Sequence, residues 1–116
     1  MRCAGLDKLC LLPEDYSGSV GCLVTNEEIK KLVDMAPDKF IGFASVDPRD
    51  PEAAQKLEHA FRDLKLKGLK LHPGRVHVMP SDPIMEPIYA VCEKYNKPIL
   101  FHAGLSWEPD TLTSYC

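Results

Sequence analysis

Four short apolar segments alternate with three longer segments of helical periodicity, and this alternation most constrains the fold. Each apolar segment has the length of a buried strand and ends in Pro or Gly. These segments occupy residues 7–13, 40–48, 67–73 and 97–104. The repeat of about thirty residues is typical of a parallel strand–helix–strand unit. The pattern predicts an α/β fold of about four parallel strands with right-handed crossovers. The near-continuous apolar character of the strands indicates a sheet covered on both faces.

The helical segments carry recognisable start signals and apolar stripes. Thr25 and Glu28 have the spacing of a capping box, which predicts a first helix that ends at Pro37. Asp50 is expected to cap a second helix, with Pro51 at its first helical position. The apolar stripes of the first, second and third helices are Ile29/Leu32/Val33/Ala36, Leu57/Phe61/Leu64 and Ile84/Ile88/Val91/Cys92/Tyr95.

The totals favour one soluble domain that spans residues 1–116. A net charge of −3 gives the chain no electrostatic reason to bind nucleic acid or an anionic membrane. No apolar run approaches the length of a membrane span or a signal peptide, so a cytoplasmic location is expected. The five cysteines have neither a paired framework nor CxxC spacing, which argues against disulfides and a thiolate zinc site. Cys10 and Cys92 are interpreted as small core residues.

Polar side chains follow the second, third and fourth predicted strands. Asp47 ends the second strand, Lys70 and His72 share a face of the third, and His102 ends the fourth. Parallel α/β proteins place ligand sites at this carboxyl edge. Each residue also has a structural interpretation: His102 as a hydrogen-bonded core histidine, Asp47 before Pro48 as a turn former, and Lys70 as a solvent-facing side chain.

Two stretches of the chain resemble a known family. The segment from Lys39 to Gly74, which contains "GLKLHP", and the segment from Asp82 to Gly104, which contains "ILFHAG", are similar to the amidohydrolase-related family. That family is the metal-dependent hydrolase and decarboxylase branch of the amidohydrolase superfamily. The resemblance extends from roughly Gly5 to Gly104 and implies part of a (β/α)8 TIM barrel.

The resemblance also implies roles for individual residues. His102 corresponds to the histidine that ends the fifth barrel strand and binds a divalent metal, usually zinc. Lys70 and His72 are expected to line the pocket and assist catalysis, and Asp47, His72 and Trp107 are expected to contact a small-molecule substrate. The reaction would be hydrolysis or decarboxylation of a small carboxylate, lactone or amide, through a metal-activated water or a metal-polarised carbonyl.

The chain departs from the family pattern in its ligand set. It has no HxH motif, and no strand follows His102, so it resembles barrel strands two to five, a half-barrel fragment. A catalytic zinc needs about three protein ligands and an open position, so the isolated chain is expected to be inactive. An alternative is a catalytically inactive half-barrel that forms a homo-oligomer or binds a partner through its open sheet edges. A third is a doubly wound α/β binding domain, which the lack of a Gly-rich phosphate loop disfavours.

Overall fold

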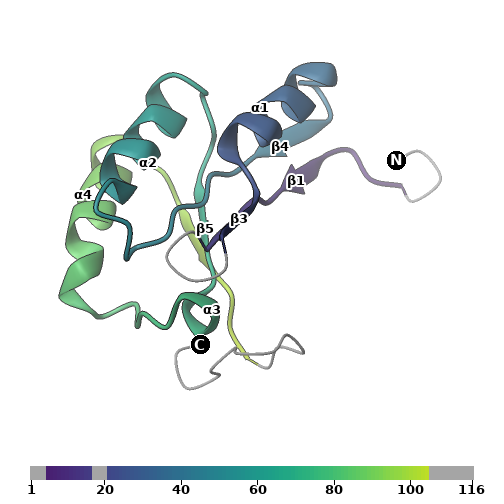
Figure 1. Ribbon diagram of the computed structural model, residues 1–116. Helices are drawn as coiled ribbons and strands as arrows, with labels where there is room; N and C mark the ends of the chain where they lie inside the picture. The colour runs from purple at the N-terminus through teal and green to yellow at the C-terminus, as the bar shows by residue number, and fades with distance from the viewer. Residues whose placement is uncertain (1–4, 17–20, 105–116) are drawn as a thin grey trace.

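Parallel strands alternate with helices along most of the chain (Figure 1). The computed structural model describes residues 5–16 and 21–104. The parallel strands are β1 (Leu9–Leu11), β4 (Phe40–Gly42), β5 (Leu69–Leu71) and β6 (Ile99–Phe101). The longer helices are α1 (Asn26–Met35), α2 (Ala53–Arg62) and α4 (Glu86–Lys94). The predicted alternation of four strands with three helices is therefore confirmed.

The four strands lie side by side in chain order. β1 pairs with β4 and β5 pairs with β6, both in parallel. A parallel bridge between Ala44 and Leu69 joins the two pairs. Around this bridge, Lys70 N–H donates to the carbonyl of Ala44 at 2.7 Å, and Ala44 N–H donates to the carbonyl of Gly68 at 2.8 Å. The carboxyl ends of all four strands therefore point toward the same edge.

One hydrophobic core lies between the strands and the three longer helices. Leu57 of α2 and Leu69 of β5 are fully buried, and Ile88 of α4 is 1% exposed. Ile29 of α1 joins the same cluster. Cys92 of α4 is 4% exposed, so it is a core residue as predicted, and this burial raises the pKa of its thiol to about 11.

The first helix begins as its sequence predicts. The Thr25 hydroxyl accepts from the Glu28 N–H at 3.0 Å, and the Glu28 carboxylate accepts from the Thr25 N–H at 2.8 Å. This capping box satisfies two backbone donors that the helix itself leaves unpaired. The apolar stripe is only partly covered, because Leu32 is 42% exposed while Ile29 is 3% exposed.

The start of the second helix differs from the prediction. α2 begins at Ala53 with Glu52 at the N-cap, whereas Asp50 and Pro51 were expected there. Asp50 instead accepts from the Glu52 N–H at 2.9 Å and pairs with Lys56, so it organises the turn that precedes the helix.

The third helical segment is divided between Met85 and Glu86. A short 3-10 turn, η2 (Pro83–Met85), precedes α4, which holds Pro87 in its first turn. Proline is tolerated there because the first N–H groups of a helix have no intrahelical partner. Ile84 belongs to the turn rather than to the buried stripe and is 45% exposed.

Two segments that the sequence predicted to be irregular contain regular secondary structure. β2 (Glu14–Tyr16) and β3 (Gly21–Val24) form an antiparallel pair after β1. A four-residue helix, α3 (Pro73–Val76), follows β5 directly. Both lie beyond the carboxyl ends of strands, where the sequence predicted long connections.

The expectation of a sheet covered on both faces is wrong for the described residues. Leu12, just after β1, is 38% exposed and Leu100 in β6 is 44% exposed. Cys10 of β1 is also exposed, so its predicted place in the core is wrong as well. The helices cover one face only, because their core contacts involve alternate strand positions such as Leu69 and Leu71. Among the described residues, no helix combines the length and hydropathy that a membrane crossing requires.

Gly42 tests the packing of α1 on the sheet. A Cβ at this position would lie 2.8 Å from the Ile29 Cγ2 and 2.9 Å from the Val33 Cγ2. These methyl groups sit on β-branched side chains with little freedom to move. We expect Gly42→Ala to lower the free energy of unfolding by about 1–3 kcal/mol in urea titrations.

The matched control is Leu32→Ala on the exposed part of α1, which should change stability by less than about 0.5 kcal/mol. The cost of Gly42→Ala should also be smaller in a Val33→Ala background, where one clashing methyl is gone. Equal costs in both backgrounds would contradict close packing at this position.

Asp50 makes the stability depend on pH. The hydrogen bond from Lys56 holds the pKa of the Asp50 carboxyl below its ordinary value of 3.8, and the Glu52 N–H adds to this effect. The folded state therefore binds a proton less readily than the unfolded state, and Asp50 stabilises the fold above about pH 4. We expect the stability difference between wild type and Asp50→Asn to be constant near neutral pH and to shrink as the pH falls through the lowered pKa. Urea titrations from pH 7 to pH 3 measure it, and Lys56→Met should weaken the same pH dependence.

Candidate metal and substrate site

Two histidines from neighbouring strands meet at the carboxyl edge of the sheet. His72 follows β5 and His102 follows β6, and their imidazole rings stack with centroids 3.9 Å apart and planes 14° from parallel. The pairing of Leu71 with Phe101 places the next residues of both strands side by side. The His102 N–H donates to the Leu71 carbonyl at 2.9 Å, which extends the β5–β6 pairing to the histidines. The structure thus brings together two of the predicted site residues.

His102 carries a buried nitrogen with no hydrogen-bond partner within the described part of the chain. This atom is Nε2, and its solvent exposure is negligible. A buried polar atom without a partner costs about 1–3 kcal/mol. Neutral imidazole nitrogen is a good ligand for divalent transition metals, which would satisfy the lone pair. This atom therefore fits the role that the sequence predicts for His102.

His72 holds a different position from that of a second ligand. Its side chain is 8% exposed, and its Nδ1 accepts from the Arg75 N–H at 3.3 Å, which caps α3. This hydrogen bond leaves the ring proton on Nε2. Imidazole lone pairs lie in the ring plane, so two stacked, nearly parallel rings direct them along separate planes. In this arrangement His72 and His102 do not share one metal ion.

Lys70 lies on the face of the sheet that the helices leave open. Its neighbours Leu69 and Leu71 point into the core, and Lys70 pairs in register with the exposed Leu100. The alternation of a strand therefore places Lys70 on the same face as His72, two residues further on. Its side chain is half-buried.

Asp47 is buried and engaged with its own turn. The residue is fully buried, and its carboxylate accepts from the Arg49 N–H at 2.9 Å. It also accepts from the side-chain Nε and Nη2 of Arg49, each at 3.2 Å. This placement agrees with the turn-forming interpretation. The predicted contact of Asp47 with substrate stays a prediction. Arg49 was not singled out from the sequence, although the Asp-Pro pair directly before it is a turn signal.

A second contact that the sequence did not reveal holds the same strand end. The side-chain carbonyl of Asn26, the first residue of α1, accepts from the Ser45 N–H at 2.9 Å. Ser45 is 4% exposed. The bond ties the start of α1 to the chain that leaves β4, so it stabilises the position of the Asp47 turn. A lone Asn at a helix start gives no sequence signal for such a partner.

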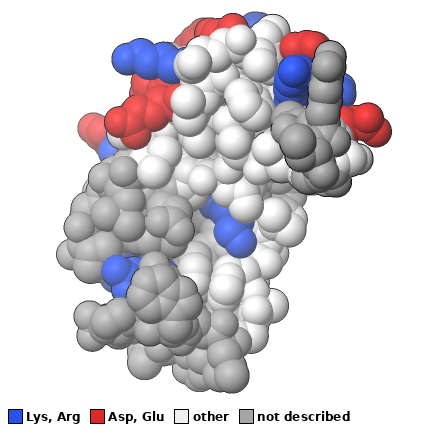
Figure 2. Space-filling model, turned by 90° about the vertical axis from the view of Figure 1, so that its right-hand side faces the viewer, with Lys and Arg blue, Asp and Glu red and all other residues white. Residues whose placement is uncertain are grey.

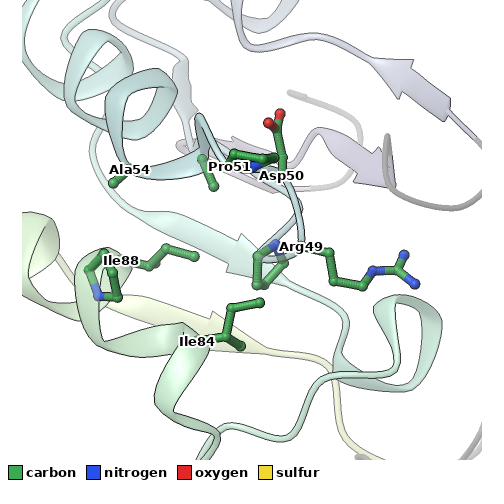
Figure 3. Close-up of a pocket in the computed structure, with 9 residues that line it drawn as sticks. Arg49, Asp50, Pro51, Ala54, Ile84 and Ile88 are labelled. Atoms are coloured by element: carbon green, nitrogen blue, oxygen red, sulfur yellow. The ribbon is translucent and has the colours of Figure 1, made fainter.

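An open cavity of about 330 Å³ lies on the helix side, away from the histidine rings. Pro51 and Ala54 from the α2 side face Ile84 and Ile88 from the α4 side (Figure 3). The carboxylate of Asp50 points away from these apolar groups in the same view. The cavity is lined mainly by apolar atoms, and its two charged lining residues, Arg49 and Asp50, are paired with Asp47 and Lys56.

Other residues of the described chain add no further metal ligand. Trp107 lies outside the described residues. His59 is exposed on α2, where its Nδ1 lies 2.8 Å from Asp63, as a surface histidine would. Within residues 5–16 and 21–104, no group of three or more His, Cys, Asp or Glu side chains is placed to hold a metal. The described residues therefore fit one metal ligand, His102, and not a complete set.

Comparison with known proteins identifies the family to which the chain is similar. The family model described as amidohydrolase matches residues 20–115. Over 84 residues the chain is 29% identical to a 2-amino-3-carboxymuconate-6-semialdehyde decarboxylase from Dictyostelium discoideum, across 72% of this chain and 23% of that protein.

Solved structures show the same fold. An uncharacterised TIM-barrel protein from Bordetella bronchiseptica matches 99% of this chain and 40% of its own length, with a TM-score of 0.81 and 24% identity. A 5-carboxyvanillate decarboxylase from Novosphingobium aromaticivorans, solved with bound manganese, matches 70% of this chain and 24% of its own length, with a TM-score of 0.61 and 26% identity. The chain spans less than half the length of each of these three relatives. It belongs to the amidohydrolase family, and the strands and helices it contributes are part of a TIM barrel.

Proposed function

We propose that this chain forms part of a metal-dependent decarboxylase, with His102 as one ligand of a divalent metal and a small unsaturated carboxylate as substrate. The buried, unpartnered Nε2 of His102 at the carboxyl edge carries the proposal. Two of the relatives named above are decarboxylases, which favours loss of CO2 over hydrolysis of a lactone or amide. The manganese in one relative favours Mn²⁺ beside the Zn²⁺ that the sequence suggests.

The remaining ligands would come from outside the described residues. A catalytic metal site needs about three protein ligands, and the described residues offer one. A bound metal would polarise a substrate oxygen and neutralise developing negative charge. The activity therefore belongs to a complete barrel, of which this chain supplies one part.

The chain's own side chains have separate tasks in this proposal. Lys70, a cation on the open face, attracts the substrate carboxylate toward the histidine pair. Decarboxylation breaks the bond between the carboxylate group and the substrate carbon that bears it. CO2 departs, and the electron pair left on that substrate carbon takes up a proton. The ammonium of Lys70 is suited to supply that proton, whereas His72, a neutral imidazole whose Nδ1 accepts from the Arg75 N–H, is suited to donate a hydrogen bond to the substrate through its Nε2–H.

The proposed role of His102 can be tested without activity. Mn²⁺ is paramagnetic and broadens NMR signals near its binding site. We expect substoichiometric Mn²⁺ to broaden the ring signals of His102 and of the stacked His72. His102→Ala should remove the broadening of His72, whereas the control His59→Ala on the surface of α2 should leave it unchanged. Undiminished broadening of His72 in His102→Ala would contradict the assignment.

The structural role of His72 must be separated from its chemistry. Loss of its cap on α3 should cost about 1 kcal/mol, so His72→Ala should be less stable than wild type in urea titrations. His72→Asn keeps a side-chain acceptor for the Arg75 N–H and should recover most of that loss. His72→Asn keeps the cap but lacks the imidazole Nε2–H, so it tests the contribution of that donor to CO2 release from 5-carboxyvanillate and similar carboxylates in a complete barrel. Equal destabilisation by Ala and Asn would show that the cap contributes little.

A further inference from the structure

The strand pairing fixes where the His102 side chain starts but not how its ring is turned. The His102 N–H donates to the Leu71 carbonyl at 2.9 Å, so the backbone at this residue is held by β5. The torsion between Cβ and the imidazole joins a tetrahedral carbon to a planar ring, and such torsions have broad minima. The direction of the Nε2 lone pair, which lies in the ring plane, therefore depends on what the ring itself contacts.

Hydrogen bonds do not hold the His102 ring within the described residues. No hydrogen bond to either ring nitrogen is made in residues 5–16 and 21–104. Metal-binding histidines are commonly oriented by a carboxylate or carbonyl that accepts from the second ring nitrogen. The nearest candidate by sequence position, the buried Asp47, accepts from Arg49 instead. On the face that Figure 2 shows, acidic side chains gather at the upper rim, the end away from α3 in Figure 1.

The face of the His72 ring is the contact that remains. The two imidazoles lie parallel to within 14°, and their centroids are 3.9 Å apart, which is close to contact of the two ring faces. Rotation of the His102 ring about its last torsion would drive one ring edge into His72. The stack therefore restricts the plane of the His102 ring and, with it, the plane that contains the Nε2 lone pair.

The His72 ring is itself held from a second side. Its Nδ1 accepts from the Arg75 N–H at 3.3 Å, and its backbone carbonyl accepts from the Arg75 and Val76 N–H groups at 3.0 and 3.1 Å. Pro73 and Gly74, which follow it in α3, are buried. A side chain that the fold has already ordered can orient a neighbour at little further cost in conformational entropy.

The stack and a metal ion on His102 would also support each other. Coordination at Nε2 draws electron density from the ring and leaves it partly positive. A positive group is attracted to the negative face of a neutral aromatic ring. His72 presents such a face, because its Nδ1 accepts a hydrogen bond and the ring is the neutral form.

We infer that His72 is a positioning residue for the metal ligand His102, and that it acts through the face of its ring. This inference rests on the proposed function, since it concerns how that ligand is oriented. The orienting task belongs to the ring face, whereas the cap on α3 belongs to Nδ1. The two tasks can therefore be separated: His72→Phe keeps a ring and loses the cap, and His72→Asn keeps the cap and loses the ring.

The stack can be measured without metal by NMR. Protons that lie over the face of an aromatic ring give signals shifted upfield by its ring current. We expect the ring protons of His102 to lie upfield of those of the exposed His59. His72→Phe should move them further upfield, because a benzene ring has the stronger ring current. His72→Asn should bring them close to those of His59, and unchanged His102 signals in this variant would overturn the inference.

Mn²⁺ affinity, measured from the electron paramagnetic resonance signal of the free ion, tests the positioning. We expect His72→Asn to raise the Kd for Mn²⁺ about tenfold, the usual cost of losing a group that orients a metal ligand. His72→Phe should stay close to the wild-type Kd although urea unfolds it more easily. The surface control His59→Asn should leave the Kd unchanged.

The pattern across these variants separates this inference from the proposed function. A wild-type Kd in His72→Asn, or a Kd in His72→Phe as weak as in His72→Asn, would overturn the positioning role while metal binding by His102 stands. Mn²⁺ binding that His102→Ala does not weaken would instead overturn the proposed function. A merely structural role of His72 predicts that Phe, which loses the cap, weakens binding more than Asn.

Discussion

The structure depends on the parallel contact between the chain after β4 and β5. Three backbone hydrogen bonds of 2.7–2.8 Å, which link Gly42 to Lys67, Ala44 to Gly68 and Ala44 to Lys70, join two strand pairs into one sheet. Without this junction, β1–β4 and β5–β6 would be separate two-stranded units, which are marginal in water. With it, three helices share one core, and the carboxyl ends of four strands meet at one edge.

The carboxyl edge of this sheet brings the predicted site residues together. The register of β5 with β6 sets His72 beside His102, and the α3 cap then fixes the His72 ring through the Arg75 N–H. The His102 ring keeps a buried Nε2 that nothing in the described residues satisfies. Folding alone would not favour such an atom, and the proposed metal would satisfy it. The same geometry separates the tasks of the two histidines, since stacked rings direct their lone pairs along different planes.

Sequence reasoning was most successful where a residue's role is local or periodic. The Thr25–Glu28 capping box, the order of the parallel strands, and the meeting of His72 with His102 at one edge all follow from spacing along the chain. It failed where the outcome depends on distant contacts. Asp50 lies in a turn that its pairing with Lys56 stabilises, instead of capping the helix. Cys10 was expected in the core because its strand is apolar, but it is exposed among the described residues. The bond from Ser45 to Asn26 joins residues with no pattern in common. Only the resemblance to a known family suggested a metal role for His102, which stays a prediction, because imidazole at a strand end is by itself equally compatible with a core histidine.

Direct observation of the metal–nitrogen bond is the decisive measurement. Pulsed electron paramagnetic resonance of Mn²⁺ added to chain with ¹⁵N-labelled histidine reports imidazole nitrogen bound to the ion. The account predicts ¹⁵N coupling from one imidazole in wild type, retained in His72→Asn and absent in His102→Ala. Coupling that persists in His102→Ala, or no imidazole coupling in wild type, would contradict the assignment of His102 as a metal ligand.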